Sequence, residues 1–412
     1  MTIRELEEGG RWLLPDGVEE ILPPQARRIE QLRRRLLDLF DLWGYELVLP
    51  PLLEYLESLL VGVGGDLDLQ TFKVTDQLTG RMMGIRADIT SQVARIDAHV
   101  LGRPGPSRLC YAGTVLRTRP EGLFGSRTPI RIGAELYGVP GPEGDAEVLA
   151  LMTETLARAG VASTQVELGH TAIFRSLARS LDLAPELERQ VFEAVQRKAG
   201  ADLDALLDGL AAGAARRTAE MVRALPALFG GAEVLVRARE VLAGAPAAVA
   251  AALDELDAIH ARIQRRVPGL EMGFDLSELH GYHYHSGAVF SAYASEHGRA
   301  VARGGRYDDI GHLFGRARPA TGFDADLKVL AELAGETPAS CELIQAPDDE
   351  RLAPPQVQTL WERVAALREA GHRVVVGNAE DATHRLAWRG DGWVAEPLAG
   401  AATGKHRADG DS

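Results

Sequence analysis

The sequence predicts an α+β protein in which an antiparallel sheet is flanked by helices, with a helical insertion and a small C-terminal α/β unit. Strand-like segments joined by hairpin turns occupy the first third of the chain, and they do not alternate with helices as in a doubly wound sheet. Residues 173–267 are rich in alanine, leucine, arginine and glutamate and show no strand-like alternation. After residue 335, a strand, a helix and another strand precede a hairpin pattern.

The first predicted helix covers Gln25–Trp43, where apolar residues recur at the three-and-four spacing of an amphipathic helix. Gly44 ends this helix, and Tyr45–Leu49 is expected to be a strand that stops at Pro50-Pro51. The helix also carries a run of arginines. No aromatic residues are interleaved with them, so we interpret the arginines as a solvated face and not as a nucleic-acid site.

Alternation and turn residues predict further strands. Thr71–Thr75 and Arg81–Arg86 are expected to form a hairpin, followed by a helix at Ile89–Val100. The other segments expected to be strands are Arg108–Arg117, Ile130–Val139, Met272–Phe274 and Ala288–Ala294.

These elements predict how the chain is divided. Residues 1–172 and 268–334 are expected to be the two parts of one core, residues 173–267 the helical insertion, residues 335–400 a truncated α/β domain, and residues 401–412 a disordered tail. The C-terminal domain is expected to contain a strand near Cys341–Gln345, a helix at Gln356–Ala370, a strand at Arg373–Val376 and a hairpin ending near Pro397.

Charge and cysteine content narrow the class of protein. The 412 residues include 45 Lys plus Arg and 59 Asp plus Glu, a formal charge of −14, so the chain as a whole repels a polyanion. Its two cysteines, Cys110 and Cys341, form no CxxC motif and indicate neither a disulfide framework nor a cysteine zinc site. The sequence shows no apolar leader and no run of about 18 apolar residues. We therefore expect a cytoplasmic protein without a membrane partner.

Five segments recur in a recognisable order: the opening helix–strand–proline unit, IRADITSQVAR, the strand–loop–strand from Arg108 to Tyr137, HGYHYHSGAVF and GGRYD. Together they resemble histidyl-tRNA synthetase, a class II aminoacyl-tRNA synthetase, over roughly residues 8–330. A narrower resemblance is carried by WLLPDGVEEILPPQARRIEQLRR, YELVLPPLLEYLESLL, GIRADITSQVARIDAH and RLCYAGTVLRTRP. These phrases resemble the synthetase-like regulatory subunit of ATP phosphoribosyltransferase, the first enzyme of histidine biosynthesis.

The narrower resemblance implies a subunit that performs no chemistry itself. It implies that the chain assembles with a short-form catalytic subunit, activates it and takes part in feedback inhibition by histidine. It also implies a homodimer core within a hetero-oligomer, because class II folds use the opening helix for dimerisation. We accordingly expect no catalytic residues, no cofactor and no tRNA partner. The alternatives are an active histidyl-tRNA synthetase and a tRNA-binding synthetase paralogue.

Departures from the synthetase pattern support the non-catalytic interpretation. Val329 stands where the closing helix of a synthetase carries an arginine against the ATP phosphates, and Leu116 and Thr118 stand at an ATP-contacting arginine and its companion glutamate. Arg117 lies one residue from Leu116, but side chains one apart on a strand point to opposite faces. Losing one well-placed donor to developing charge costs about 3–4 kcal/mol, so these changes together are expected to remove ATP chemistry.

The segment HGYHYHSG contains a third departure, because His280 and His283 replace an arginine and an aspartate of the synthetase pattern. Together with His285 these histidines are candidate metal ligands, since imidazole is a common ligand. No cysteine or settled carboxylate accompanies them. Ordinary strand residues are the favoured interpretation, and no metal is expected.

The resemblance implies that an amino-acid pocket is partly kept. The candidate histidine-binding residues are Asp88, Thr90, Arg131, Glu135, Tyr284 and Arg306. A buried carboxylate can pair with an α-ammonium group, and a second acid or a tyrosine can hold imidazole N–H groups. Arg306 is a candidate for holding a carboxylate. The alternative is that Asp88 and Glu135 are internal salt-bridge partners, with Arg86 and Arg131 as the cations.

Overall fold

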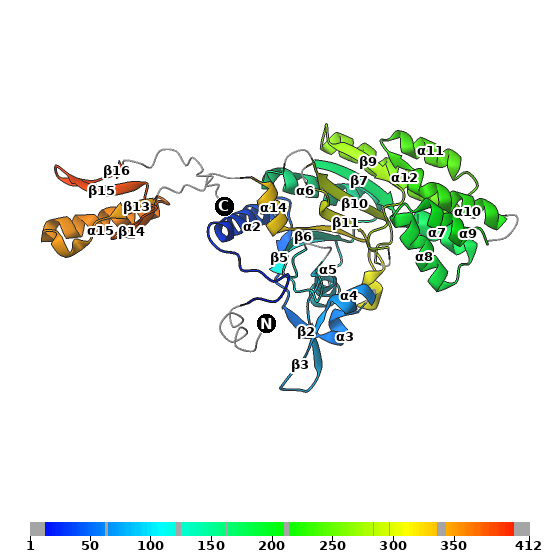
Figure 1. The fold of residues 1–412 in the computed structure, drawn as a ribbon, viewed down its shortest axis with the longest axis horizontal. Coiled ribbons are helices and arrows are strands. Elements are labelled where there is room, and N and C mark those ends of the chain that lie inside the picture. The colour runs from blue at the N-terminus through cyan, green and yellow to red at the C-terminus, as the bar shows by residue number, and fades with distance from the viewer. Residues whose placement is uncertain are drawn as a thin grey trace, which may run out of the picture. The chain divides into compact units, whose positions relative to one another are not determined.

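The computed structural model describes residues 13–61, 65–120, 125–161, 164–209, 214–282, 284–295, 297–335 and 343–398. The chain forms two compact units, Met1–Gly335 and Glu336–Ser412 (Figure 1). The tail expected to be disordered, 401–412, lies outside the described residues, as do Cys341 and His283.

A nine-stranded sheet forms the centre of the first unit, in the order β1-β5-β6-β12-β11-β10-β7-β9-β8. The six strands from β5 to β7 in that order pair antiparallel, whereas β1 with β5 and β7 with β9 pair parallel. The strands are β1 (Glu46–Leu47), β5 (Ser107–Thr114), β6 (Ile130–Tyr137), β7 (Thr164–His170), β8 (Phe229–Gly230), β9 (Glu271–Asp275), β10 (Ala288–Ala294), β11 (Ala300–Arg306) and β12 (Ala320–Asp326).

Helices pack against one face of this sheet and share one large apolar core with it. They are α2 (Gln25–Leu42), α6 (Gly141–Ala159), α12 (Ala247–Arg266) and α14 (Leu327–Leu333). Along β6, the side chains of Ile132, Ala134 and Leu136 are buried in this core. Successive side chains of a strand point to opposite faces, so Arg131 and Glu135 face the other side of the sheet.

That other face carries a smaller core and a three-stranded sheet. The smaller core contains Leu109, Tyr111 and Tyr307 together with Val93 of α5. The elements here are α3 (Leu56–Leu59), α4 (Gly65–Gln70), α5 (Thr90–Arg95), which continues as a π-helical turn (Ile96–Leu101), and α13 (Ile310–Leu313). The small sheet has the order β2-β4-β3, with β2 (Leu53–Tyr55), β3 (Phe72–Thr75) and β4 (Met82–Ile85). The expected hairpin is confirmed by the antiparallel pairing of β3 with β4.

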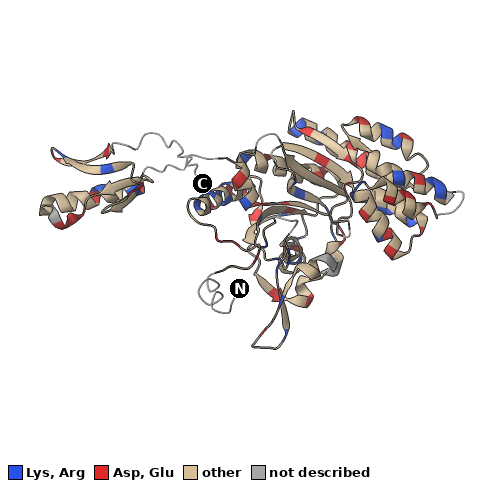
Figure 2. Ribbon diagram, viewed as in Figure 1, with Lys and Arg blue, Asp and Glu red and all other residues tan. Residues whose placement is uncertain are grey.

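The segment expected to be all-helical forms a bundle beside the β7 end of the sheet (Figure 1). Its helices are α7 (Thr171–Leu181), α8 (Pro185–Gln196), α9 (Gly200–Leu207), α10 (Ala214–Ala224), a 3-10 turn (Leu225–Ala227), α11 (Glu233–Val241) and α12. One correction is needed, because the two-residue strand β8 lies inside this segment and pairs with β9. Acidic and basic residues are interspersed along these helices (Figure 2), and many form ion pairs, as Arg239 does with Asp254 and Asp257.

The second unit has a four-stranded sheet in the order β14-β13-β15-β16. Its elements are β13 (Leu343–Ala346), a 3-10 turn (Asp349–Arg351), α15 (Pro354–Glu369), β14 (Arg373–Val376), β15 (His384–Arg389) and β16 (Gly392–Pro397). Leu360 and Val364 of the helix share one apolar core with Trp393 of β16. The expected strand–helix–strand followed by a hairpin is confirmed by these pairings.

Candidate functional site

A cavity of about 830 Å³ lies over the face of β6, β11 and β12 that is turned away from α2 and α6. Five of the six expected site residues line it: Asp88, Thr90, Arg131, Glu135 and Tyr284. The far wall comes from α8 of the helical insertion, which contributes Phe192 and Glu193 among others. Residues that are far apart in the sequence therefore meet at one site.

Two glycines allow the floor of this cavity to form. A Cβ atom at Gly322 of β12 would lie 1.6 Å from Oε2 of Glu135, and one at Gly133 of β6 would lie 2.5 Å from the hydroxyl oxygen of Tyr111. Both side chains thus lie directly against main-chain atoms, where any larger residue would clash. Glycine at these two positions is therefore required by close approach of side chains.

Glu135 is the most enclosed acid of the site, with 1% of its surface exposed. The hydroxyl of Tyr111 donates to its Oε1 at 3.3 Å, and the hydroxyl of Tyr307 donates to its Oε2. Burial raises the pKa of Glu135 to about 8, although the hydrogen bond from Tyr307 acts in the opposite direction. Burial therefore favours the protonated form of this carboxyl group relative to an exposed glutamate.

Asp88 precedes α5 and lies beside Glu135. The main-chain N–H of Thr90 donates to Oδ2 of Asp88 at 3.0 Å, and the hydroxyl oxygens of Thr90 and Tyr111 lie 3.3 Å apart. Burial raises the pKa of Asp88, and the negative charge of Asp324 raises it further. Several acids concentrated in one enclosed space favour a ligand that carries positive charge and N–H donors.

The arginines proposed as alternative partners of these acids are engaged elsewhere. Arg131 forms two hydrogen bonds with the carboxylate of Asp324, one of them 2.6 Å long from Nε to Oδ2. Although burial opposes it, Asp324 raises the pKa of Arg131. Arg86 donates to the main-chain oxygens of Pro50 and Thr114 at 2.8 and 3.0 Å. These hydrogen bonds of the two guanidinium groups therefore go to acceptors other than Asp88 and Glu135.

Three residues that line the cavity have a buried polar atom with no hydrogen-bond partner among the described residues. The first is Oγ of Ser91 at the start of α5. The second is the hydroxyl of Tyr284, whose ring packs on that of Tyr307 with centroids 5.0 Å apart. The third is Nε2 of His280, whose Nδ1 lies 3.0 Å from Oε1 of Glu278. Buried polar groups are almost always paired, so these three atoms are candidates for contact with a ligand.

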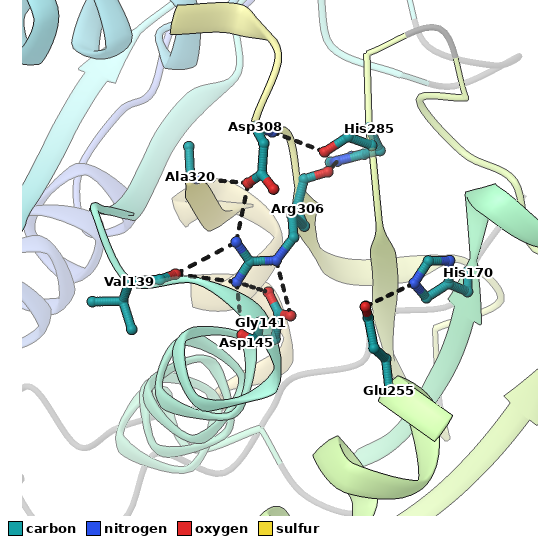
Figure 3. A network of polar contacts seen from close by, with 10 residues as sticks. Val139, Gly141, Asp145, His170, Glu255, His285, Arg306, Asp308 and Ala320 are labelled. Carbon is teal, nitrogen blue, oxygen red and sulfur yellow. Dashed lines mark hydrogen bonds and ion pairs between the residues drawn. The ribbon is translucent and has the colours of Figure 1, made fainter. Parts of the chain in front are cut away.

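The sixth expected residue, Arg306, does not line this cavity. Its guanidinium lies in a separate buried network with Asp145 and Asp308 (Figure 3), and it also donates to the main-chain oxygen of Gly141 at 2.9 Å. Arg306 does hold a carboxylate, as the sequence suggested, but that carboxylate belongs to Asp145 of the same chain.

A second cavity of about 700 Å³ shares Arg117, Arg131, Arg303 and Asp324 with the first. Val329 lines it, where the resemblance had placed the missing arginine. The neighbouring ammonium of Lys328 donates to Oε1 of Glu19 at 2.8 Å.

Leu116 and Thr118, the two positions compared with an arginine and a glutamate, contribute to local structure. The main-chain N–H of Leu116 donates to the oxygen of Arg86 at 3.0 Å. The hydroxyl of Thr118 donates to the main-chain oxygen of Leu69 at 2.6 Å. Thr118 therefore ties this loop to α4.

Sequence reasoning missed Tyr111, Tyr307 and Asp324, which complete the site. Tyr307 directly follows the GGR segment, and Asp324 lies two residues beyond Gly322, on the same face of β12. Period-two alternation would have placed Asp324 at the cavity, but only the pairing of β12 with β6 shows that Gly322 lies opposite Glu135.

The histidine segment does not form a metal centre among the residues that the structure describes. Within that part of the chain, no group of three His, Cys, Asp or Glu side chains is placed to hold a metal ion. Burial lowers the pKa of His285 to about 3, and its Nδ1 lies 3.3 Å from the main-chain oxygen of Arg306. In the same described residues, no helix is long and apolar enough to cross a membrane.

Comparison with known proteins places this architecture. The family profile for histidyl-tRNA synthetase matches residues 17–330. An ATP phosphoribosyltransferase regulatory subunit of Thioalkalivibrio sulfidiphilus is 55% identical, covering 91% of this chain and 93% of that protein. The corresponding protein of Ectopseudomonas mendocina is 53% identical, covering 94% of this chain and 98% of that protein.

A solved structure agrees with these matches. It is described as an ATP phosphoribosyltransferase regulatory subunit/histidyl-tRNA synthetase from Bacillus halodurans C, with a TM-score of 0.78 at 25% identity. The match covers 89% of this chain and 93% of that one. The predicted α+β, class II synthetase-like fold is thereby confirmed. The chain belongs to the family of ATP phosphoribosyltransferase regulatory subunits, which has the fold of histidyl-tRNA synthetase.

Proposed function

We propose that this chain activates a short-form ATP phosphoribosyltransferase catalytic subunit and makes the activity of the complex sensitive to histidine. The observation that carries the proposal is identity of 53–55% to regulatory subunits over more than nine-tenths of both chains. A non-catalytic, regulatory role in histidine biosynthesis and partnership with a catalytic subunit follow from family membership. The short form of the partner, the histidine effect and the oligomeric core are the proposed parts.

The chemistry of the first cavity supports histidine as the effector. Asp88 and Glu135 are carboxylates suited to an α-ammonium group and to imidazole N–H groups, and both line one enclosed space. The unpartnered hydroxyl of Tyr284 adds a group that can either donate or accept. In this proposal histidine binds in the first cavity and is not converted into an adenylate.

The second cavity supports the absence of adenylate formation. Adenylate formation needs preorganised positive charge at the ATP phosphates. Here an uncharged side chain, Val329, takes part of the wall, and the charge of Lys328 is met by Glu19. The pair of Arg131 with Asp324 likewise neutralises a cation that borders this space.

A homodimer core is supported by exposed apolar side chains near β1. This strand lies at one end of the large sheet and pairs only with β5 among the described strands. Leu42, Leu47 and Leu49 are 78%, 48% and 77% exposed. Adjacent exposed leucines at a sheet edge are typical of a covered interface. Leu49→Glu is expected to halve the mass of the isolated chain in light scattering, and an unchanged mass would contradict this interface.

The activating role is tested by mixing the purified chain with a short-form catalytic subunit. We expect the two to co-elute from a sizing column and the rate of phosphoribosyl transfer to rise well above that of the catalytic subunit alone. If the chain neither co-elutes nor changes the rate, the proposal fails.

The histidine effect is tested on the assembled complex. Histidine should inhibit the wild-type complex, and Asp88→Ala should shift the inhibition curve to higher histidine concentration. Asp68→Ala, which removes an exposed acid paired with Lys73 on the neighbouring hairpin, serves as the control and should leave the curve in place. An unshifted curve for Asp88→Ala would locate the histidine site elsewhere.

A further inference from the structure

Arg306 connects segments of the first unit that are far apart in the sequence. It ends β11, and its side chain is only 5% exposed. Its guanidinium donates to Asp145 of α6, to the main-chain oxygen of Gly141 where α6 begins, and to Asp308 (Figure 3). All of these acceptors belong to the chain itself, so Nε, Nη1 and Nη2 of Arg306 already donate hydrogen bonds within the fold.

Asp308 connects Arg306 to the start of β12 and to the 284–287 segment. The Asp308 carboxylate, held at 3.0 Å from Nη1 of Arg306, accepts from the main-chain N–H of Ala320 at 2.8 Å, where β12 begins. The main-chain N–H of Asp308 donates to the hydroxyl of Ser286 at 2.8 Å. Ser286 follows the segment that carries Tyr284 and His285.

The main chain of Arg306 makes the same connection. Its oxygen accepts from the N–H of Ser286 at 2.7 Å and lies 3.3 Å from Nδ1 of His285. A Cβ at Gly287 would lie 3.0 Å from Cδ of Arg306, so the arginine side chain runs closely alongside this segment. The next residue, Tyr307, places its hydroxyl on Glu135 and its ring on Tyr284.

We propose that Arg306 is a positioning residue for the effector cavity: it fixes β11, α6 and the 284–287 segment relative to one another, so that Tyr307 is held against Glu135 and Tyr284 against Tyr307. Arg306 itself does not touch the ligand. The inference rests on the proposed histidine site, and it replaces the direct contact that the sequence had suggested for this arginine.

Burial of the pair argues that its role is more than general stability. The Arg306 and Asp145 side chains are 5% and 0% exposed. Removing two charges from water offsets much of their mutual attraction, so a well-packed apolar pair would often serve stability equally well. A planar donor with several fixed N–H directions, however, sets the relative positions of several partners at once.

The experiment compares Arg306→Met with Arg318→Met. Arg318 pairs with Asp97 in the same unit, with side chains 9% and 1% exposed, and neither residue lines the cavity. Both variants should lose thermal stability. Only Arg306→Met should also weaken histidine binding, by about tenfold or more, the scale of a hydrogen bond to a charged group. Arg306→Lys keeps the charge but not the planar donors, so it should recover part of the affinity.

The pH dependence of histidine binding distinguishes positioning from a purely structural role, because a structural role would leave the pH midpoint unchanged. Burial raises the pKa of Glu135 to about 8 even though the hydrogen bond from Tyr307 lowers it. If Tyr307 is displaced, this pKa rises further, and the pH midpoint of histidine binding must rise with it. Calorimetric titrations from pH 6 to 9 should therefore show the same upward shift in Arg306→Met and in Tyr307→Phe. The titration of histidine itself is common to all variants, and Arg318→Met should keep the wild-type midpoint.

The outcomes separate this inference from the proposed function. If wild type binds histidine and Arg306→Met keeps its affinity and its pH midpoint, positioning by Arg306 is overturned while the histidine site stands. If wild type activates the catalytic subunit but gives no histidine signal in calorimetry, the site and the positioning role fall together while activation stands. A tenfold loss with a raised midpoint, absent in Arg318→Met, supports the inference.

Discussion

The two neighbouring cavities of the first unit differ in how their charges are satisfied. In the first, Glu135 accepts hydrogen bonds from the hydroxyls of Tyr111 and Tyr307, and the hydroxyl of Tyr284 has no partner among the described residues. In the second, Lys328 is met by Glu19, and Val329 occupies part of the wall. The first cavity thus holds acceptors and an unpartnered hydroxyl, whereas in the second the charges of Lys328 and Arg131 are met by Glu19 and Asp324.

Under the proposed function, this difference reflects a synthetase-like fold that has lost a reaction and kept recognition. Recognition of an amino acid needs a few acceptors and donors in an enclosed space, and those remain at the centre of the sheet. Phosphate chemistry needs preorganised cations that are not neutralised by their own neighbours. The ion pair of Arg131 with Asp324 borders both cavities, together with Arg117 and Arg303.

Removing the ion pair of Arg131 with Asp324 should have the largest effect, and that effect should be on stability. The side chains of Arg131 and Asp324 are 18% and 15% exposed. In Arg131→Met the Asp324 carboxylate loses its cation in an enclosed site, and the free energy of unfolding should fall by roughly 3–5 kcal/mol. Urea denaturation measures this. Arg216→Met removes an exposed pair with Glu220, 75% and 57% exposed, and should change stability by less than about 1 kcal/mol. Equal losses in the two variants would contradict a special role for this ion pair.

The second-largest effect is expected from neutralising the acid of the first cavity. Glu135→Gln keeps the shape of the side chain but cannot become a charged acceptor, so histidine affinity should fall by roughly 10- to 150-fold, equivalent to about 1.5–3 kcal/mol. Calorimetry of the isolated chain measures this. Glu193→Gln, an acid of the same cavity that is 46% exposed and paired with Arg189, should change affinity by less than about threefold. Unchanged affinity in Glu135→Gln would show that histidine does not bind against Glu135.

The pH dependence of stability sharpens the comparison further. The folded-state pKa of Glu135 is raised from 4.5 to about 8 by burial, so the folded chain binds this proton more tightly than the unfolded chain. The stabilisation is present at low pH and is lost as pH rises through about 8, with a slope of at most about 1.4 kcal/mol per pH unit.

The contribution of Glu135 to stability is best measured between pH 6.5 and 8. His285, whose folded-state pKa is lowered from 6.5 to about 3, contributes stability that is lost as pH falls below 6.5, so it opposes Glu135 only at lower pH. The groups that face Glu135 are Asp88, Tyr111, Arg131, Tyr137, Tyr284, Tyr307 and Asp324. Urea midpoints should decline through this window in wild type and decline less in Glu135→Gln. Parallel pH profiles would show that the Glu135 carboxyl group is ionised in the folded chain.

Much of the fold could be predicted because its signals are local. β10 and β14 have the bounds that alternation predicted, and the end of α15 lies within one residue of the position set by Gly371. β7 was not predicted, although Thr164–His170 is as long as β10, and it directly precedes a helix-rich segment. β8 has only two residues, and nothing in a two-residue pattern distinguishes a strand from a turn.

The site could be predicted only in part, because its completion depends on strand register. Glu135 and Asp88 were found through resemblance to known motifs, and the structure brings them to one cavity. The tyrosines on Glu135 come from β5 and from the residue after β11, and no local pattern shows that their hydroxyls meet. Arg306 was predicted to hold a carboxylate at the ligand site, but the carboxylate that it holds is that of Asp145, 161 residues away in the chain.

The smallest effect is expected from returning one cation to the second cavity. Val329 is half-buried beside the large apolar core, so Val329→Arg should cost little stability, about 1 kcal/mol, because a long arginine can keep its stem on the core and its charge in solvent. Histidine-dependent exchange of pyrophosphate into ATP should stay undetectable. One added guanidinium does not replace the donors absent at Leu116 and His280, and each missing donor costs about 3–4 kcal/mol of transition-state stabilisation. Measurable exchange in this variant would mean that the second cavity is a synthetase site lacking a single residue, and the contrast between the two cavities would then rest on Val329 alone.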